Sequence, residues 1–234
     1  MSDHDIAGIS IPDYGTAYAG VRERTSALVR AASSEQLCTI APATPEWTVK
    51  DVLAHMVGVP TDVLAGRMDG VATDAWTEAQ VERYREVDLE RVLAEWDEAS
   101  ATVEPMIADF GVMAGQAIAD VVTHEHDIRH ALDAPGAHAS DAVLIGSAWC
   151  AQWAGQRATE TGRGPLRIET ELWSQTFGED EPATTLRTTA FELLRAATGR
   201  RSEAQIAAFD WDGPACADLI VLAIFTPRPE DFTG

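Results

Sequence analysis

Histidine and acidic side chains are concentrated in the segment DVVTHEHDIRHAL, which spans residues 120–132. Asp120 and His124 are four residues apart, and side chains at that spacing lie one above the other on a helix. An imidazole nitrogen beside a carboxylate oxygen is a donor set that suits zinc, nickel or iron(II). The same spacing also fits a simple surface hydrogen bond between the two side chains, so the segment alone leaves both interpretations open.

The turn of a helix, about 100° per residue, divides this segment into two groups. Asp120, His124 and Asp127 lie in one strip along the edge of the apolar face. His126 and His130 point to the far side, and we expect both to face water. Their spacing also suits a metal, but an outward direction is typical of adventitious metal binding. The strip beside the core is therefore the better candidate.

A third ligand can come from the segment VKDVLAHMVG, residues 49–58. His55 lies at the edge of the apolar face of this predicted helix, and helices of a bundle can bring such side chains together. His55, Asp120 and His124 could therefore form a metal site, with Asp127 expected to orient a ligand rather than bind the ion. A histidine beside an apolar face is also often a hydrogen-bonded boundary residue, and that alternative stays open.

Helices must position these residues, because apolar side chains recur at helical spacing through the first two-thirds of the chain. Thr48 and Asp51 form the pattern of a capping box at the start of the second helix. Gly58 and Pro60 predict an end or a kink within it. The predicted helices span residues 16–37, 48–70, 88–110, 115–132 and 140–161.

The composition changes at the segment GRGPL, after the fifth predicted helix. The next segment, LRIETE, alternates in polarity as a half-buried strand does, and further helices are predicted over residues 185–198 and 202–209. These patterns predict two domains, which are a helical bundle over residues 1–162 and a small α/β domain over residues 163–234.

Charge and cysteine content limit the partners and the location that we expect. The chain carries 38 acidic and 17 basic residues, for a net charge of -21. Such an acidic surface repels phosphate groups, so neither nucleic acid nor an anionic membrane is an expected partner. Three widely spaced cysteines without a CxxC pair favour a reducing, cytoplasmic location over a disulfide framework. No apolar run approaches the ~18 residues of a membrane span, and the run from Leu219 to Phe225 is expected in the core.

Three segments, taken together, resemble the mycothiol-dependent maleylpyruvate isomerase family of the DinB-like metalloprotein superfamily. PEWTVKDVLAHMVG, whose Trp47 is expected to be a packing residue, resembles the family's tryptophan-led second helix, and DVVTHEHDIRHAL resembles its carboxylate-x-x-x-His helix. FELLRAATGRRSEAQIAAFDWDG resembles the helix and Gly-Arg turn of its C-terminal domain. The resemblance implies a mainly α fold, a DinB-like up-down four-helix bundle with a small α/β C-terminal domain. It also implies His55, Asp120 and His124 as ligands of a divalent metal, with zinc expected before nickel or iron.

The resemblance further implies a low-molecular-weight thiol, mycothiol, as a cosubstrate. A free thiol has a pKa near ~8.5, and a coordinating divalent cation deprotonates it. The thiolate can add to an electrophilic double bond, allow rotation and leave again, which isomerises maleylpyruvate-like substrates. If it stays attached, the protein is a thiol S-transferase. We expect no catalytic residue beyond the metal site, and a monomer or a homodimer.

Arg200 and Arg201 are the candidates for binding an anionic substrate, because arginine offers a pair of donors to a carboxylate. Surface ion pairs are the alternative for both. The family often has glutamate where this chain has Asp120, and aspartate is shorter by one methylene. This departure leaves the identity of the metal open and favours a second hypothesis, a non-catalytic DinB-like metal- or ligand-binding protein such as a sensor or carrier.

Overall fold

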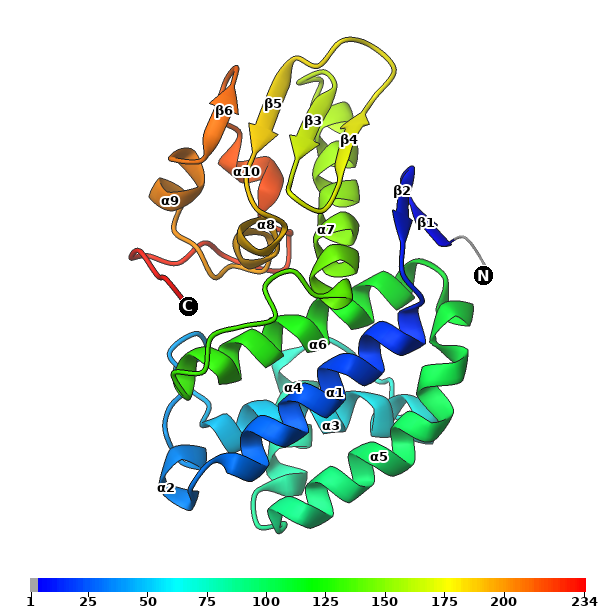
Figure 1. The fold of residues 1–234 in the computed structure, drawn as a ribbon, viewed down its shortest axis with the longest axis vertical. Helices are drawn as coiled ribbons and strands as arrows, with labels where there is room; N and C mark the ends of the chain where they lie inside the picture. Colours follow the sequence, from blue (N-terminus) through cyan, green and yellow to red (C-terminus); the bar gives the residue numbers. More distant parts are fainter. Residues whose placement is uncertain (1–3) are drawn as a thin grey trace. The chain divides into compact units, whose positions relative to one another are not determined.

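Helices make up most of residues 4–234, which are the residues described by the computed structural model (Figure 1). This confirms the predicted mainly α fold with a small sheet in the C-terminal region. Contacts between residues divide the chain into two units, which we describe separately. The helical unit comprises residues 14–114 and 124–136, and the mixed unit comprises residues up to 13, 115–123 and 137–234.

The helical unit is a bundle whose members pack through apolar faces. Its elements are α1 (Tyr14–Ala31), α2 (Ser34–Leu37), α3 (Val49–Ala65), α4 (Asp74–Tyr84), α5 (Leu89–Met106), the 3-10 helix η1 (Ile107–Phe110) and the second half of α6 (Val112–Ala131). Helix α3 packs against both α4 and α5, and α1 packs against α5. The buried Trp96 belongs to this core, and its indole N–H donates to the hydroxyl of Tyr18 at 3.1 Å.

Helix α3, which carries His55, begins with the predicted capping box. The side chain of Thr48 accepts from the N–H of Asp51, and the side chain of Asp51 accepts from the N–H of Thr48. The helix continues through Pro60 and ends at Gly66, whose φ of 67° lies in the left-handed region that favours glycine. Pro60 therefore does not end the helix, and His55 lies in its middle.

Two features of the helical unit differ from the prediction. The helix expected over residues 16–37 is interrupted, because Ser33 caps the separate short helix α2 with a capping box of its own. Helix α4 is not predicted by the sequence pattern at all, since DAWTEAQVERY contains few apolar residues. Its buried residues are Gln80, Val81 and Tyr84, close to its C-terminal end.

The mixed unit is arranged around helix α7 (Asp141–Glu160), which Ser140 caps. The other elements are β1 (His4–Ile6), β2 (Ile9–Ile11), β3 (Leu166–Glu169), β4 (Ser174–Phe177), β5 (Thr184–Arg187), α8 (Ala190–Ala197), α9 (Glu203–Ala207), β6 (Asp210–Asp212) and α10 (Ala217–Ile220). Strands β1 and β2 form an antiparallel pair. The larger sheet has the strand order β4-β3-β5-β6, with β3 and β5 parallel and the other neighbours antiparallel. Helix α7 contacts β3, β4 and α8, as Figure 1 shows.

Helix α7 packs on the sheet and on α8, and the two-domain division at residue 162 stays a prediction. Two details of the mixed unit differ from the prediction. The helix expected over residues 185–198 begins only at Ala190, because the preceding residues pair with β3 and Thr189 caps α8. The apolar run that starts at Leu219 leaves the core before it ends, since Ile224 is 69% exposed. Within residues 4–234, no helix combines the length and the apolar composition needed to cross a membrane.

Candidate metal centre

Helix α6 carries most of the predicted ligands and is more enclosed than the sequence indicates. Every residue from Val121 to Ile128 is buried, so this stretch has no water-facing side. His130 is exposed as predicted. The prediction that His126 faces water is wrong, because its side chain is buried with the rest of this stretch. Glu125 is buried as well, and two arginines neutralise its carboxylate at 2.7 and 2.9 Å.

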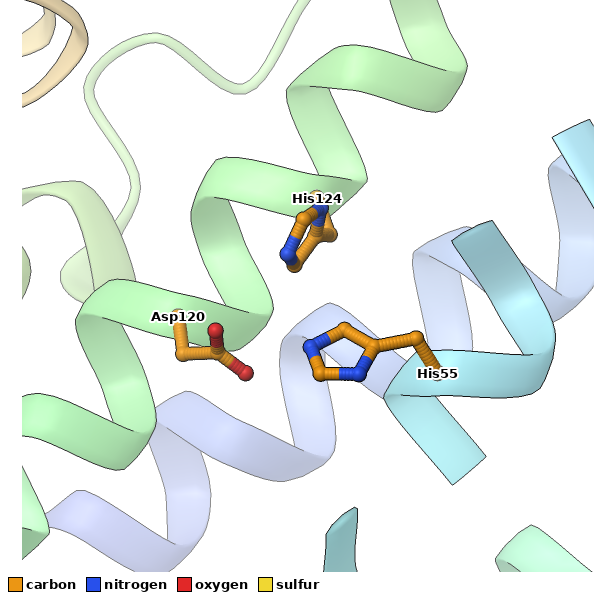
Figure 2. A group of neighbouring side chains, drawn as sticks. All are labelled: His55, Asp120 and His124. Atoms are coloured by element: carbon orange, nitrogen blue, oxygen red, sulfur yellow. The ribbon is translucent and has the colours of Figure 1, made fainter. Parts of the chain in front are cut away.

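Three predicted ligand residues come together in the structure (Figure 2). His55, Asp120 and His124 each offer one ligand atom, and these atoms all lie within 4.8 Å of one another. Helix α6 supplies Asp120 and His124 from successive turns, and α3 supplies His55. Both histidines are buried, whereas Asp120 is half-buried. One cation is therefore within reach of all three side chains.

An aromatic side chain lies against both imidazoles. The rings of His55 and His124 meet edge to face, with centroids 4.9 Å apart. The half-buried indole of Trp47 is 5.3 Å from the first ring and 6.1 Å from the second, measured between centroids. Trp47 directly precedes the Thr48 cap of α3, and that position brings it to this end of the helix. The sequence predicts a packing role for Trp47, but it does not indicate that this indole lies beside two candidate ligands.

Each candidate histidine is held by an outer partner through Nδ1. The Nδ1 of His55 lies 2.8 Å from Oε1 of Gln80, which comes from α4. The Nδ1 of His124 lies 3.1 Å from a carboxylate oxygen of Asp127, three residues further along α6. In both rings Nε2 is then the nitrogen that can bind a metal. That Asp127 orients a metal ligand stays a prediction.

Gln80 and its own partner, Asp62, were not among the predicted site residues. The amide of Gln80 donates to Asp62 at 2.8 Å, and Asp62 is ion-paired with two arginines. A signal for Asp62 exists in the sequence, because it follows His55 by seven residues and so returns to the same side of α3. Gln80 carries no comparable signal, since α4 itself is not predicted from the pattern.

The donor set fits a divalent cation. Two imidazole nitrogens and one carboxylate oxygen are ligands that zinc accepts, and catalytic zinc sites usually combine three protein ligands with one position for another molecule. Outer partners on both histidines are also typical of metal ligands, whose tautomer they fix. His55, Asp120 and His124 could therefore hold a cation such as zinc, with Gln80 and Asp127 behind them.

The two arginines predicted to bind substrate are buried in the mixed unit. Arg201 forms an ion pair with Glu192 at 2.6 and 2.7 Å and also donates to the carbonyl oxygen of Gly234 at 2.8 Å. Arg200 donates to the carbonyl oxygen of Thr198 at 2.6 Å. These contacts connect helix α8 to the segments that follow it. Substrate contact by either arginine stays a prediction.

The three cysteines differ in burial. Cys150 is buried on α7, and burial raises the pKa of its thiol far above the ordinary value. Cys216 is also buried, whereas Cys38 is exposed. A buried thiol with a raised pKa stays protonated at neutral pH, so Cys150 is not a candidate nucleophile.

Comparison with known proteins finds a family model and two solved structures. The family model described as the DinB superfamily matches residues 17–139. A crystal structure of mycothiol-dependent maleylpyruvate isomerase is 12% identical, and the match covers 84% of this chain and 92% of that one with a TM-score of 0.49. A second structure, of a histidine-to-alanine mutant of that isomerase, is 11% identical and covers 91% and 98%, again with a TM-score of 0.49. No curated protein matches the chain.

Proposed function

The chain belongs to the DinB superfamily, and from that membership we propose that it is a metal-dependent enzyme that uses a low-molecular-weight thiol. We take the thiol to be mycothiol and the reaction to be isomerisation of maleylpyruvate-like substrates or S-transfer of the thiol to an electrophile. The observation that carries the proposal is the convergence of His55, Asp120 and His124 within 4.8 Å. We expect zinc as the metal and the cytoplasm as the location.

The residues of the chain divide the work of such a site. His55 and His124 each offer a neutral imidazole nitrogen, and Asp120 adds a negative charge that favours a divalent cation. Gln80 and Asp127 restrict the two rings. A cation bound there would act as a Lewis acid and lower the pKa of a thiol, so that the thiol ionises at neutral pH. Because both histidines are buried, the protein excludes bulk water from their side of the centre.

The choice of thiol and of reaction rests on the sequence resemblance of the two ligand-bearing segments and the Gly-Arg segment. In the proposed isomerisation, the thiolate adds to a carbon–carbon double bond, rotation follows about the resulting single bond, and elimination releases the thiolate and the isomer. In the proposed S-transfer, elimination does not occur and the thiol remains attached to its acceptor. The pocket for the acceptor decides between the two outcomes, and Arg200 and Arg201 remain our candidates for an anionic acceptor.

Metal content tests the centre directly. We would strip the purified protein with a chelator, reload it with zinc and measure zinc per chain for the wild type and for His55→Ala and His124→Ala. We expect about one zinc per wild-type chain and a large loss in both variants, because each removes one of three ligands. His130→Ala is the matched control, since this exposed histidine lies on the same helix and should leave zinc content unchanged. Full zinc content in both ligand variants would refute the proposal.

Turnover separates the enzyme from the alternative of a non-catalytic binder. We would incubate the zinc-loaded protein with mycothiol and a panel of electrophilic alkenes, and follow both free thiol and alkene geometry. Loss of thiol indicates S-transfer, and a changed geometry at constant thiol indicates isomerisation. Asp120→Glu addresses the departure from the family pattern, and we expect it to retain zinc because the carboxylate is preserved. Zinc binding without any turnover across the panel would favour the sensor or carrier instead.

A further inference from the structure

We propose that Gln80 is a positioning residue of the metal centre. With Asp62 behind it, Gln80 fixes the tautomer and the ring orientation of His55, so that Nε2 of this ring is presented to the cation. The proposal rests on the metal centre of the proposed function, but it requires neither the thiol nor the substrate. It therefore has a test of its own in metal binding.

The hydrogen bonds determine which way the Gln80 amide points. A carboxylate only accepts hydrogen bonds, so the NH2 group of Gln80 must face Asp62, to which it donates at 2.8 Å. The amide oxygen then faces His55, and it too can only accept. The Nδ1 of His55, 2.8 Å away, must therefore carry the proton. That leaves the lone pair on Nε2, and Figure 2 shows a ring nitrogen of His55 directed toward Asp120.

Asp62 is placed to hold this amide in one orientation. Its side chain is buried, and one of its oxygens is ion-paired with Arg67 at 2.5 Å and Arg83 at 2.7 Å. Its other oxygen takes the amide of Gln80. A negative charge behind the amide also polarises it, which strengthens the bond to His55 and makes the imidazole a better ligand.

The close approach of α4 to α3 depends on a glycine. Gly58 lies one turn beyond His55, and a Cβ atom added there would lie 2.5 Å from both Cβ and Cγ of Gln80. Glycine within a helix is less stable than alanine. The close packing of Gln80 against Gly58 explains why glycine nevertheless occupies this position. His55, Gly58 and Asp62 therefore form one face of α3 that receives the side chain of Gln80.

Zinc affinity is the measurement that tests the proposal. We would titrate zinc into the metal-free protein in competition with a chromophoric chelator, and compare the wild type with Gln80→Leu. We expect the Kd to rise by about 10- to 100-fold, which is the usual effect of removing the outer partner of a metal ligand. Tyr84→Phe is the matched control. It lies one turn further along the same helix and is buried, and the substitution removes a hydroxyl that hydrogen-bonds to Glu95 and Thr61.

An exchanged pair provides a rescue that a merely structural role would not show. In the double variant Asp62→Asn/Gln80→Glu, the new carboxylate at position 80 can accept from both His55 and the new amide at position 62. Net charge and side-chain volume are nearly unchanged. We expect this variant to regain most of the zinc affinity lost in Gln80→Leu. Cobalt(II) absorption, recorded on the same proteins, should show wild-type bands in the double variant and altered bands in Gln80→Leu.

The outcomes separate this proposal from the previous one. A wild-type protein that takes up no zinc would overturn both. Tight binding by the wild type and equal binding by Gln80→Leu would overturn the positioning role and leave the metal centre intact. Should Gln80→Leu fail to fold, the substitution Gly58→Ala decides, because it displaces Gln80 without removing it. We expect weaker zinc binding from that variant, and an unchanged Kd would overturn the proposal.

Discussion

In the helical unit, one oxygen of the buried Asp62 carboxylate is ion-paired with two arginines, and the other accepts a hydrogen bond from the side-chain amide of Gln80. In the mixed unit, the buried guanidinium of Arg201 takes Glu192 on two nitrogens and donates to the carbonyl oxygen of Gly234. Both networks bury a charge and neutralise it with an ion pair. They differ in the residue that the hydrogen bonds reach beyond the ion pair.

The residue at which each hydrogen-bond network ends distinguishes a network that supports the candidate site from one that holds backbone segments together. The first network continues from Asp62 through Gln80 to His55, an ionisable side chain among the candidate metal ligands. The second donates to the backbone carbonyl oxygen of Arg200, which cannot bind or release a proton under ordinary conditions. A buried ion pair alone is weak evidence for function or stability, so the residue at which the chain of hydrogen bonds ends is more informative than the pair.

The largest effect is expected from breaking the first network. Asp62→Leu removes the acceptor for the Gln80 amide and leaves a buried donor unpaired. We expect the free energy of unfolding to fall by about 1–3 kcal/mol, which is the cost of the unpaired amide. The loss is no larger because solvent can hydrate the two arginines. We also expect the Kd for zinc to rise by about 10- to 100-fold. Denaturant unfolding of the metal-free protein and chelator competition measure the two quantities. A loss of stability with unchanged zinc affinity would make the two networks equivalent.

A smaller effect, confined to stability, is expected from breaking the second network. Arg201→Met removes the ion pair with Glu192 and the bond to Gly234. Glu192 is partly exposed and can be hydrated, so we expect a decrease of about 1 kcal/mol in the free energy of unfolding. Zinc affinity should not change, and the same two measurements apply. Weaker zinc binding in this variant would connect Arg201 to the site and remove the contrast between the networks.

The smallest effect concerns an exposed cluster of charges on the sheet of the mixed unit. Hydrogen bonds and charge from Arg167, and then from Arg187, lower the pKa of Glu169. A lowered pKa in the folded state means that the ionised carboxylate favours folding above its unfolded pKa and that this contribution disappears as pH falls through the lowered value. Solvent screening keeps the contribution small. Urea unfolding of the wild type and Glu169→Gln should therefore differ slightly at pH 7 and converge in acid; a difference that grows in acid would contradict the assignment.

The parts of the molecule that the sequence predicted are those set by local spacing. The capping box of Thr48 and Asp51 needs only four consecutive residues, and it is present at the start of α3. The proximity of Asp120 and His124, the two candidate ligands on α6, follows from the helical repeat. His55, the third candidate, was predicted from its place beside an apolar face. The structure brings these three side chains together.

The parts that the sequence did not predict depend on contacts between segments distant in the chain. Gln80 lies on α4, whose few apolar residues give no periodic signal, and its place beside His55 comes from the packing of α4 on α3. The sequence predicts an exposed His126, because a periodic pattern identifies the most apolar face of a helix. The pattern does not show how many faces of the helix other segments bury. Residues 184–187 pair with β3 rather than extending the helix that follows, and that choice depends on a strand more than a dozen residues earlier.

The place of Trp47 beside both imidazoles gives the protein an internal optical reporter. An indole this close to the candidate metal site is expected to lose emission when a paramagnetic ion such as cobalt(II) or copper(II) binds there. Six other tryptophans contribute background fluorescence, but the difference between the emission of the wild type and that of Trp47→Phe isolates the emission of Trp47. Occupancy of the centre can therefore be followed by fluorescence in real time, without a label and at concentrations where absorbance fails.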